Sequence, residues 1–97
     1  MDERTVPRRR KVVRMRRLRD CLLVAGGDTL ELTDAAEFVF RHIDGTSTVG
    51  RLADLLAAHH DTSREAAVAD VAELVRILAD SEIVELVPAA GGRPDVS

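Results

Sequence analysis

The sequence contains no tryptophan or tyrosine, only two phenylalanines and a single cysteine, Cys21. The shortage of aromatic rings counts against recognition of single-stranded nucleic acid by base stacking. One cysteine excludes an internal disulfide and fits a reducing cytoplasm. No apolar run approaches the roughly 20 residues that span a bilayer, and no apolar segment follows the basic N-terminus as it does in a secretory signal. We therefore expect a soluble, cytoplasmic protein.

Residues that could carry catalysis or bind a metal are few and poorly spaced. Cys21 lies in the apolar run CLLVA with no histidine or acid at motif spacing, which is typical of an inert buried thiol. His59 and His60 are adjacent, so a helix directs them to different faces. Gly26 and Gly27 lack the strand–loop–helix pattern of a phosphate-binding loop. The sequence thus predicts no enzyme, no metal site and no cofactor.

Charge is distributed unevenly along the chain. Residues 1–19 hold nine Arg and Lys against two acids, whereas residues 20–97 hold five Arg against fifteen acids. A basic arm of this kind contacts nucleic acid weakly, docks on an acidic partner, docks on the acidic body of the same molecule, or stays solvated. Residues 1–10 show no periodicity and contain Pro7, so we expect a disordered arm there, and the Pro/Gly-rich residues 88–97 predict a disordered tail.

Residues 11–87 are predicted to form one small α+β domain. Alternating and short apolar runs predict three strands that form an antiparallel meander, at residues 12–16, 21–25 and 29–32. Gly26 and Gly27 are expected to supply positive φ angles in the turn before the third strand. A last short strand is expected at residues 83–87.

Capping residues and helical periodicity predict three helices after the meander. The first begins behind Thr33 and ends at Gly45, and the second runs from behind Thr46–Thr48 to His60. The third opens with a capping box of Thr62 and Glu65 and runs to about Ser81.

The third predicted helix has a wider apolar sector than a surface helix needs. The centre of that sector consists of Ala67, Val71, Leu74 and Leu78, and one flank consists of Val68, Ala72, Val75 and Ala79. Two interpretations stay open. Either the flank lines a groove while the centre packs inward, or the helix lies between two neighbours and buries the whole sector.

The order and spacing of several short motifs resemble the PqqD-like family, small peptide-binding domains that are also called RiPP recognition elements. The motifs are Leu22-Leu23 before a glycine turn, Leu30-Glu31-Leu32 leading into Ala35-Ala36, the helix end Asp44-Gly45, Thr48-Val49, and Asp70-Val71. Many relatives have Leu-Asn at the strand-to-helix junction, where this chain has Leu32-Thr33. Thr caps a helix as Asn does, so this departure bears on the subfamily and not on the fold.

The resemblance implies a winged-helix-like fold, with a three-stranded antiparallel sheet followed by three helices. It also implies a non-catalytic subunit that binds the leader segment of a ribosomally made precursor peptide. The leader would add as a strand to the edge of the third strand, beside the third helix, and be presented to a tailoring enzyme such as a radical SAM enzyme, a peptidase or a cyclase. An unpaired strand edge has free N–H and C=O groups for such a peptide.

Carried onto this sequence, the resemblance implies a backbone edge and an apolar wall. The edge is Thr29, Leu30, Glu31 and Leu32, and the wall is Val68, Val71, Ala72 and Val75. Arg76, at the rim of this wall, either pairs with a leader carboxylate or stays solvated.

Other functions stay open. Within the same family, the chain would serve as a peptide chaperone for a radical SAM enzyme in the pyrroloquinoline quinone pathway. A winged-helix DNA-binding regulator needs a basic recognition helix, and the third helix instead carries acids on its polar side, so nucleic acid is disfavoured. A plain interaction or dimerisation module would use the same sheet edge, which can pair with a second copy. No membrane partner is expected.

Overall fold

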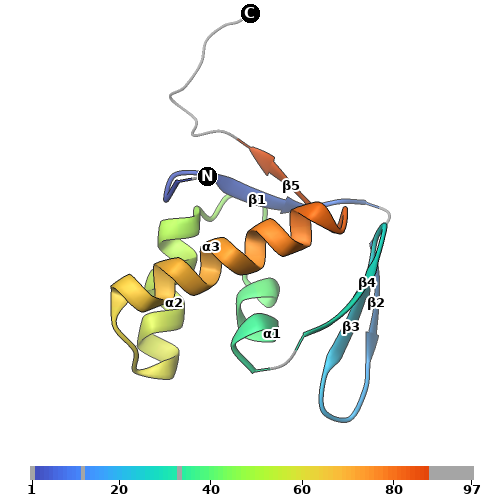
Figure 1. Ribbon diagram of the computed structural model, residues 1–97, viewed down its shortest axis with the longest axis horizontal. Coiled ribbons are helices and arrows are strands. Elements are labelled where there is room, and N and C mark those ends of the chain that lie inside the picture. The colour runs from blue at the N-terminus through green and yellow to red at the C-terminus, as the bar shows by residue number, and fades with distance from the viewer. Residues whose placement is uncertain (1, 12, 33, 88–97) are drawn as a thin grey trace, which may run out of the picture.

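The computed structural model describes residues 2–11, 13–32 and 34–87, and Figure 1 shows how its elements are arranged. The elements follow one another as β1 (Val6–Arg9), β2 (Arg14–Arg17), β3 (Leu22–Ala25), β4 (Thr29–Leu32), α1 (Asp34–Arg41), α2 (Val49–His60), α3 (Arg64–Asp80) and β5 (Val84–Val87). The meander β2–β3–β4 and the three helices form the predicted α+β arrangement. No helix within these ranges is long and apolar enough to cross a bilayer.

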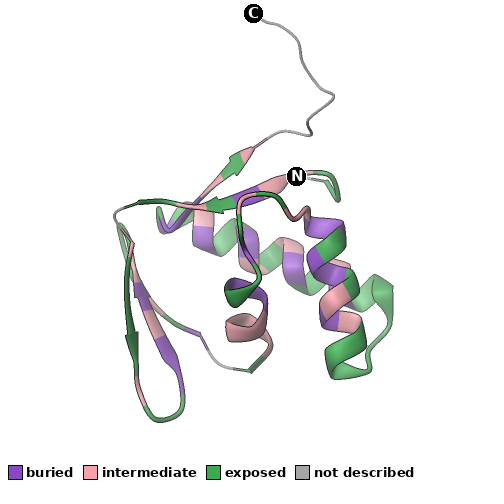
Figure 2. Cartoon of the chain, turned by 180° about the vertical axis from the view of Figure 1, so that it is seen from behind, coloured by how far each residue is buried: buried purple, intermediate pink, exposed green. Residues whose placement is uncertain are grey.

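The meander packs one face of β3 and β4 against the helices. Val24 lies opposite Met15 of β2 and opposite Leu30 of β4 in antiparallel register. Val24 and Leu32 are buried and Leu30 packs against the core, which follows from the period of two along a half-buried strand. All four residues of β2 are exposed, so this strand extends beyond the helices, as the green strand beside β3 shows in Figure 2.

Helix caps set where α2 and α3 begin. The hydroxyl of Thr48 accepts the Arg51 N–H, as predicted for the second helix. The third helix is capped one residue later than predicted, because the Ser63 hydroxyl accepts the Ala66 N–H at 3.1 Å. The predicted capping box of Thr62 and Glu65 is therefore wrong. The proposed Thr33 cap and the tail at 88–97 lie outside the described residues.

The helix α1 ends at Arg41, earlier than the predicted end at Gly45, because Asp44 builds a separate turn. The Asp44 carboxylate accepts the backbone N–H groups of Thr46 at 2.9 Å and Ser47 at 2.8 Å. These bonds replace helical ones and direct the chain into α2. Gly45 lies in the turn with φ +83°, a conformation that favours glycine.

The prediction that residues 1–10 are disordered is wrong for residues 6–9. They form β1, which pairs antiparallel with β5 from Val6 opposite Val87 to Arg9 opposite Val84. Pro7 is buried in this two-stranded ribbon. Each strand of the ribbon has a partner on only one side, so a residue without an N–H is tolerated there. The predicted last strand is confirmed as β5 and supplies the partner that β1 needs.

The two arginines of β1 dock on the body of the same molecule. Arg9 donates to the Phe40 carbonyl at 2.7 Å and its guanidinium lies 4.3 Å from the centre of the Phe40 ring. Burial lowers the pKa of Arg9. Arg8 pairs with Glu85 at 2.7 Å. Among the roles considered for the basic arm, docking on the acidic body of the same molecule therefore applies to Arg8 and Arg9.

The turn between β3 and β4 rests on the C-terminal end of α3. The Ser81 carbonyl accepts the N–H groups of Gly27 at 2.7 Å and Asp28 at 3.3 Å. A Cβ on Gly26 would lie 2.4 Å from the Glu82 carbonyl oxygen. Neither glycine of this turn has a positive φ, contrary to the prediction. Glycine is required at position 26 because two backbones approach each other closely there.

We expect Gly26→Ala to destabilise the fold by about 1–3 kcal/mol, because the new methyl group meets rigid backbone and not a flexible side chain. Gly27→Ala is the matched control, since its Cβ would meet only the Glu82 side chain, at 3.1 Å, which can move. Urea denaturation followed by circular dichroism measures both. Equal stability of the two variants would contradict the close approach.

The turn at Asp44 predicts a specific pH dependence. Hydrogen bonds from Thr46 and Ser47 lower the pKa of Asp44 from its usual 3.8 to about 2. A lowered folded-state pKa stabilises the fold above pH 3.8, and this contribution is lost as the pH falls towards 2. The stability difference between the natural chain and Asp44→Ala should therefore be constant at neutral pH and shrink on acidification. Urea denaturation across the pH range tests this, and a difference unchanged at pH 2 would refute it.

Candidate binding site

The end strand β4 has one edge without a neighbouring strand in the described structure. The Gly26 N–H donates to the Asp28 carbonyl at 2.9 Å, so Asp28 directs its carbonyl towards β3. Successive residues of an antiparallel strand direct their N–H and C=O groups to alternate sides. The backbone groups of Thr29 and Glu31 therefore point away from β3. The hydrogen bond from the Leu18 N–H to the Cys21 carbonyl closes the β2–β3 turn. It independently predicts the same alternation of backbone directions along β3 and β4.

An apolar cleft of about 190 Å³ lies between the three helices. It is lined by residues from all three helices, namely Ala35, Ala36 and Val39 of α1, Leu56 of α2, and Asp70 and Leu74 of α3. Asp70, Leu74 and Ile77 share one side of α3 at the i, i+4, i+7 spacing. Ile77 is 43% exposed, so this side of the helix offers apolar surface next to the cleft.

The predicted wall on α3 is not assembled as expected. Val71 and Val75 are 0% exposed and belong to the core, so their side chains are closed to a ligand. Val68 and Ala72 are half-buried and lie on the other side of this core stripe from Leu74. The interpretation in which α3 buries its sector is therefore right for Val71 and Val75. The available apolar side is the one with Leu74 and Ile77.

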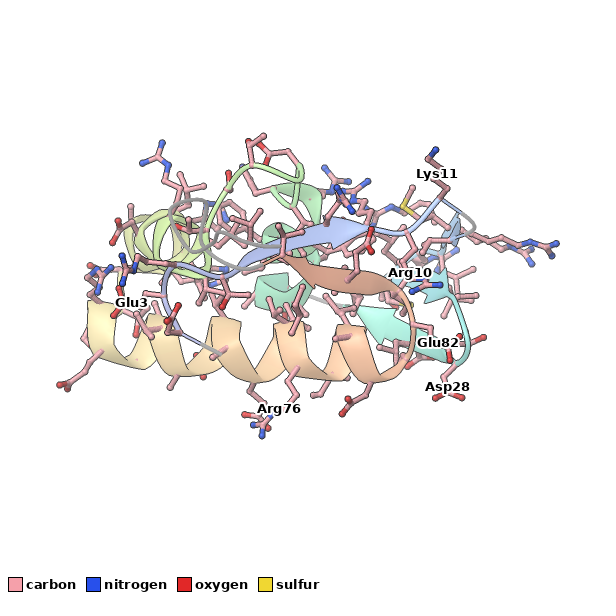
Figure 3. All side chains as sticks on the ribbon, turned by 90° about the horizontal axis from the view of Figure 1, so that it is seen from above. Glu3, Arg10, Lys11, Asp28, Arg76 and Glu82 are labelled. Atoms are coloured by element: carbon pink, nitrogen blue, oxygen red, sulfur yellow. The ribbon has the colours of Figure 1, made fainter. Side chains whose placement is uncertain are left out.

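Arg76 is separated from the cleft. It is exposed and its side chain points away from the body of the molecule (Figure 3). One residue of an α-helix corresponds to about 100° of rotation, so Arg76 lies about that far around the axis from Ile77. The predicted edge residues lie together on β4, and none of them lines the cleft. Leu30 packs against the core, Leu32 is buried beside α1, and Thr29 and Glu31 are exposed.

An ion-pair cluster holds α1 against the meander. Glu37 pairs with Arg17 of β2 and, at 3.0 Å, with Arg41 one turn further along α1. The hydrogen bond from Arg17 is the main cause that lowers the pKa of Glu37. Because α1 contributes three residues to the cleft, this cluster links the cleft wall to the meander. Within the described ranges, no three His, Cys, Asp or Glu side chains gather as a metal site requires.

The fold and site define a small α+β domain with an open strand edge and an apolar cleft between its helices. The sequence profile of the family described as coenzyme PQQ synthesis protein D (PqqD) matches residues 11–84. The chain belongs to the PqqD family, as its motifs indicate.

One solved structure is similar over most of its length. It is the solution NMR structure of the PqqD truncation of Methylobacterium extorquens PqqCD, described as a functional and stand-alone recognition element for ribosomally synthesised and post-translationally modified peptides (RiPPs). The TM-score is 0.66 and the sequence identity 29%, covering 82% of this chain and 88% of that one. A search of curated proteins finds no match.

A pair of α3 variants separates core from cleft. Val75→Asp should unfold the protein, because an unpaired carboxylate in the core costs on the order of 4 kcal/mol or more. Ile77→Asp should keep the fold, with a loss of about 1 kcal/mol or less, since this side chain already contacts water. Thermal denaturation followed by circular dichroism compares them. A folded Val75→Asp variant would place Val75 outside the core.

Proposed function

We propose that this protein is a non-catalytic peptide-recognition subunit for a ribosomally synthesised precursor peptide. It binds the leader segment of the precursor as an additional strand on β4 and presents the core segment to a modifying enzyme. Radical SAM enzymes, peptidases and cyclases are the expected partners. Membership of the PqqD family and the similarity to a RiPP recognition element support this role.

The observation that carries the proposal is the open edge of β4, together with an apolar cleft that begins at α1, the next element of the chain. A peptide strand gains affinity from main-chain hydrogen bonds and specificity from pockets that take alternate side chains. The outward backbone groups of Thr29 and Glu31 offer main-chain hydrogen bonds. The cleft between α1 and Leu74 offers a pocket, because the side chains of an added strand that lie on the same face of the sheet as Leu30 face the helices.

A more specific version of the same function is a peptide chaperone for a radical SAM enzyme in coenzyme PQQ synthesis. The description of the matching family favours it. The two versions differ in the precursor bound, and both use the β4 edge. Binding to duplex DNA has less support, since Arg64 of α3 is already held by Glu3 at 2.6 Å and Asp54 at 2.7 Å.

The test of the proposal is a titration with labelled leader peptides from precursor genes that neighbour the gene of this protein. Fluorescence anisotropy should show saturable, leader-specific binding with a Kd of about 1 μM or tighter. The core segments of the same precursors serve as the control. A folded protein that binds no neighbouring leader would refute the function.

Sedimentation of the free protein should give a monomer, whereas a dimer that dissociates on leader addition would identify the β4 edge as a shared interface.

Strand addition makes a prediction about single backbone groups of β4. Glu31→Pro removes an N–H that points away from β3, so it should weaken leader binding while the meander persists. Glu31→Ala retains the N–H and separates the loss of the side chain from the loss of the donor. Leu30→Pro removes a donor to β3 and should destabilise the meander itself. Anisotropy with circular dichroism measures the three variants, and unchanged binding by a folded Glu31→Pro would exclude strand addition here.

A further inference from the structure

The apolar cleft contains one ionisable side chain among its described lining residues, Asp70. Asp70 is exposed, and within the described part of the chain it makes no hydrogen bond or ion pair. The other lining residues are Ala, Val and Leu. A ligand that fills this cleft therefore places an apolar group against Leu74 and finds a carboxylate beside it.

Further carboxylates border the path of a peptide along β4. Glu31 is exposed on β4 itself. Asp28 and Glu82 lie together where the β3–β4 turn meets the end of α3, and both point into solvent (Figure 3). The side chain of Arg76 points away from the body, and Arg64 is held by two carboxylates. Exposed carboxylates thus occur at the β3–β4 turn, on β4 and in the cleft.

The opposite edge of the same sheet is basic. Arg14 and Arg16 of β2 are exposed, and neither forms an ion pair in the described ranges. Arg17 follows them on the same strand. Like charges in contact repel, so a cationic peptide is disfavoured at β2 and attracted to β4. Charge thereby distinguishes the two open edges of one sheet.

The spacing on α3 matches that of an extended peptide. Asp70 and Leu74 lie one helical turn apart, about 6 Å along the axis. In an extended strand, residues two positions apart point to the same side and are separated by about 6.6 Å. In Figure 1, α3 and β4 meet near the β3–β4 turn and separate from it, and α1 lies beneath α3. A peptide strand that follows α3 over this turn of the helix can place an apolar side chain at Leu74 and its second neighbour at Asp70.

We infer that the leader segment bound by this protein carries Lys or Arg two positions from the apolar residue that enters the cleft, and that Asp70 determines this specificity by pairing with the cation. This inference rests on the proposed function and adds the class of peptide that the site accepts. The opposite sign at β2 prevents the same segment from binding there.

The experiment uses a leader peptide found to bind in the titration above. Replacing its cation by Gln should weaken binding about tenfold, the scale of a charge-assisted hydrogen bond. Asp70→Asn should weaken binding of the unmodified peptide by a similar factor. The two changes together should cost no more than either alone, because they remove the same interaction.

Glu65→Gln is the matched control for net charge, since Glu65 is an exposed acid in the first turn of α3, away from the cleft side. It should leave affinity almost unchanged. An equal loss with Glu65→Gln, or additive losses in the double change, would overturn the role of Asp70 while the peptide-binding function stands. Tight binding of a leader without any Lys or Arg would overturn the inference in the same way. If no leader binds at all, the proposed function fails and this inference fails with it.

Discussion

The contact between the β3–β4 turn and the end of α3 determines the geometry of the site. The Ser81 carbonyl holds two N–H groups of the turn, and Gly26 lies against the Glu82 backbone. This contact joins the start of β4 to the end of α3, so the distance between the open edge and the helix is set there. At the other end of β4 the chain enters α1, which lines the cleft. The strand edge and the cleft are therefore positioned by contacts at both ends of a four-residue strand.

Folding arranges the uneven charge of the sequence into distinct surfaces. Part of the basic N-terminal segment is neutralised by the body, through Arg8 with Glu85 and Arg17 with Glu37. What remains on β2 is basic, and the acids of β4 and the cleft side of α3 lie beyond the other edge. A net charge of −3 consequently describes neither edge. Exposed ion pairs contribute little stability individually, so the arrangement matters more for the choice of ligand than for the fold.

The sequence predicted most of the elements, because their signals are local. The short apolar run of β3 and the caps and periodicity of α2 needed no knowledge of distant residues. The strand β1 was missed because VPRR lacks alternation and pairs with a segment 75 or more residues away. Of the predicted site residues, Thr29 and Glu31 direct their backbone groups away from β3, whereas Val75 lies in the core. A helical wheel cannot tell which side of α3 the neighbouring elements cover, so it cannot separate the buried Val75 from the exposed Ile77. The role of Gly26 depends on the Glu82 carbonyl, which is distant in the sequence and lies close only in the folded structure.

The β1–β5 ribbon has a consequence for the order in which the chain folds. Val6 pairs with Val87, so the first strand of the described structure is paired with the last. The meander and the helices between these two strands are built from contacts between residues that are nearer in the sequence. Forming these contacts closes shorter loops and therefore costs less chain entropy. During synthesis β1 therefore remains without its partner until nearly all of the described chain has emerged. The ribbon therefore forms only after β5 has been synthesised, and a chain lacking β5 would leave β1 without its partner strand and Arg8 without Glu85.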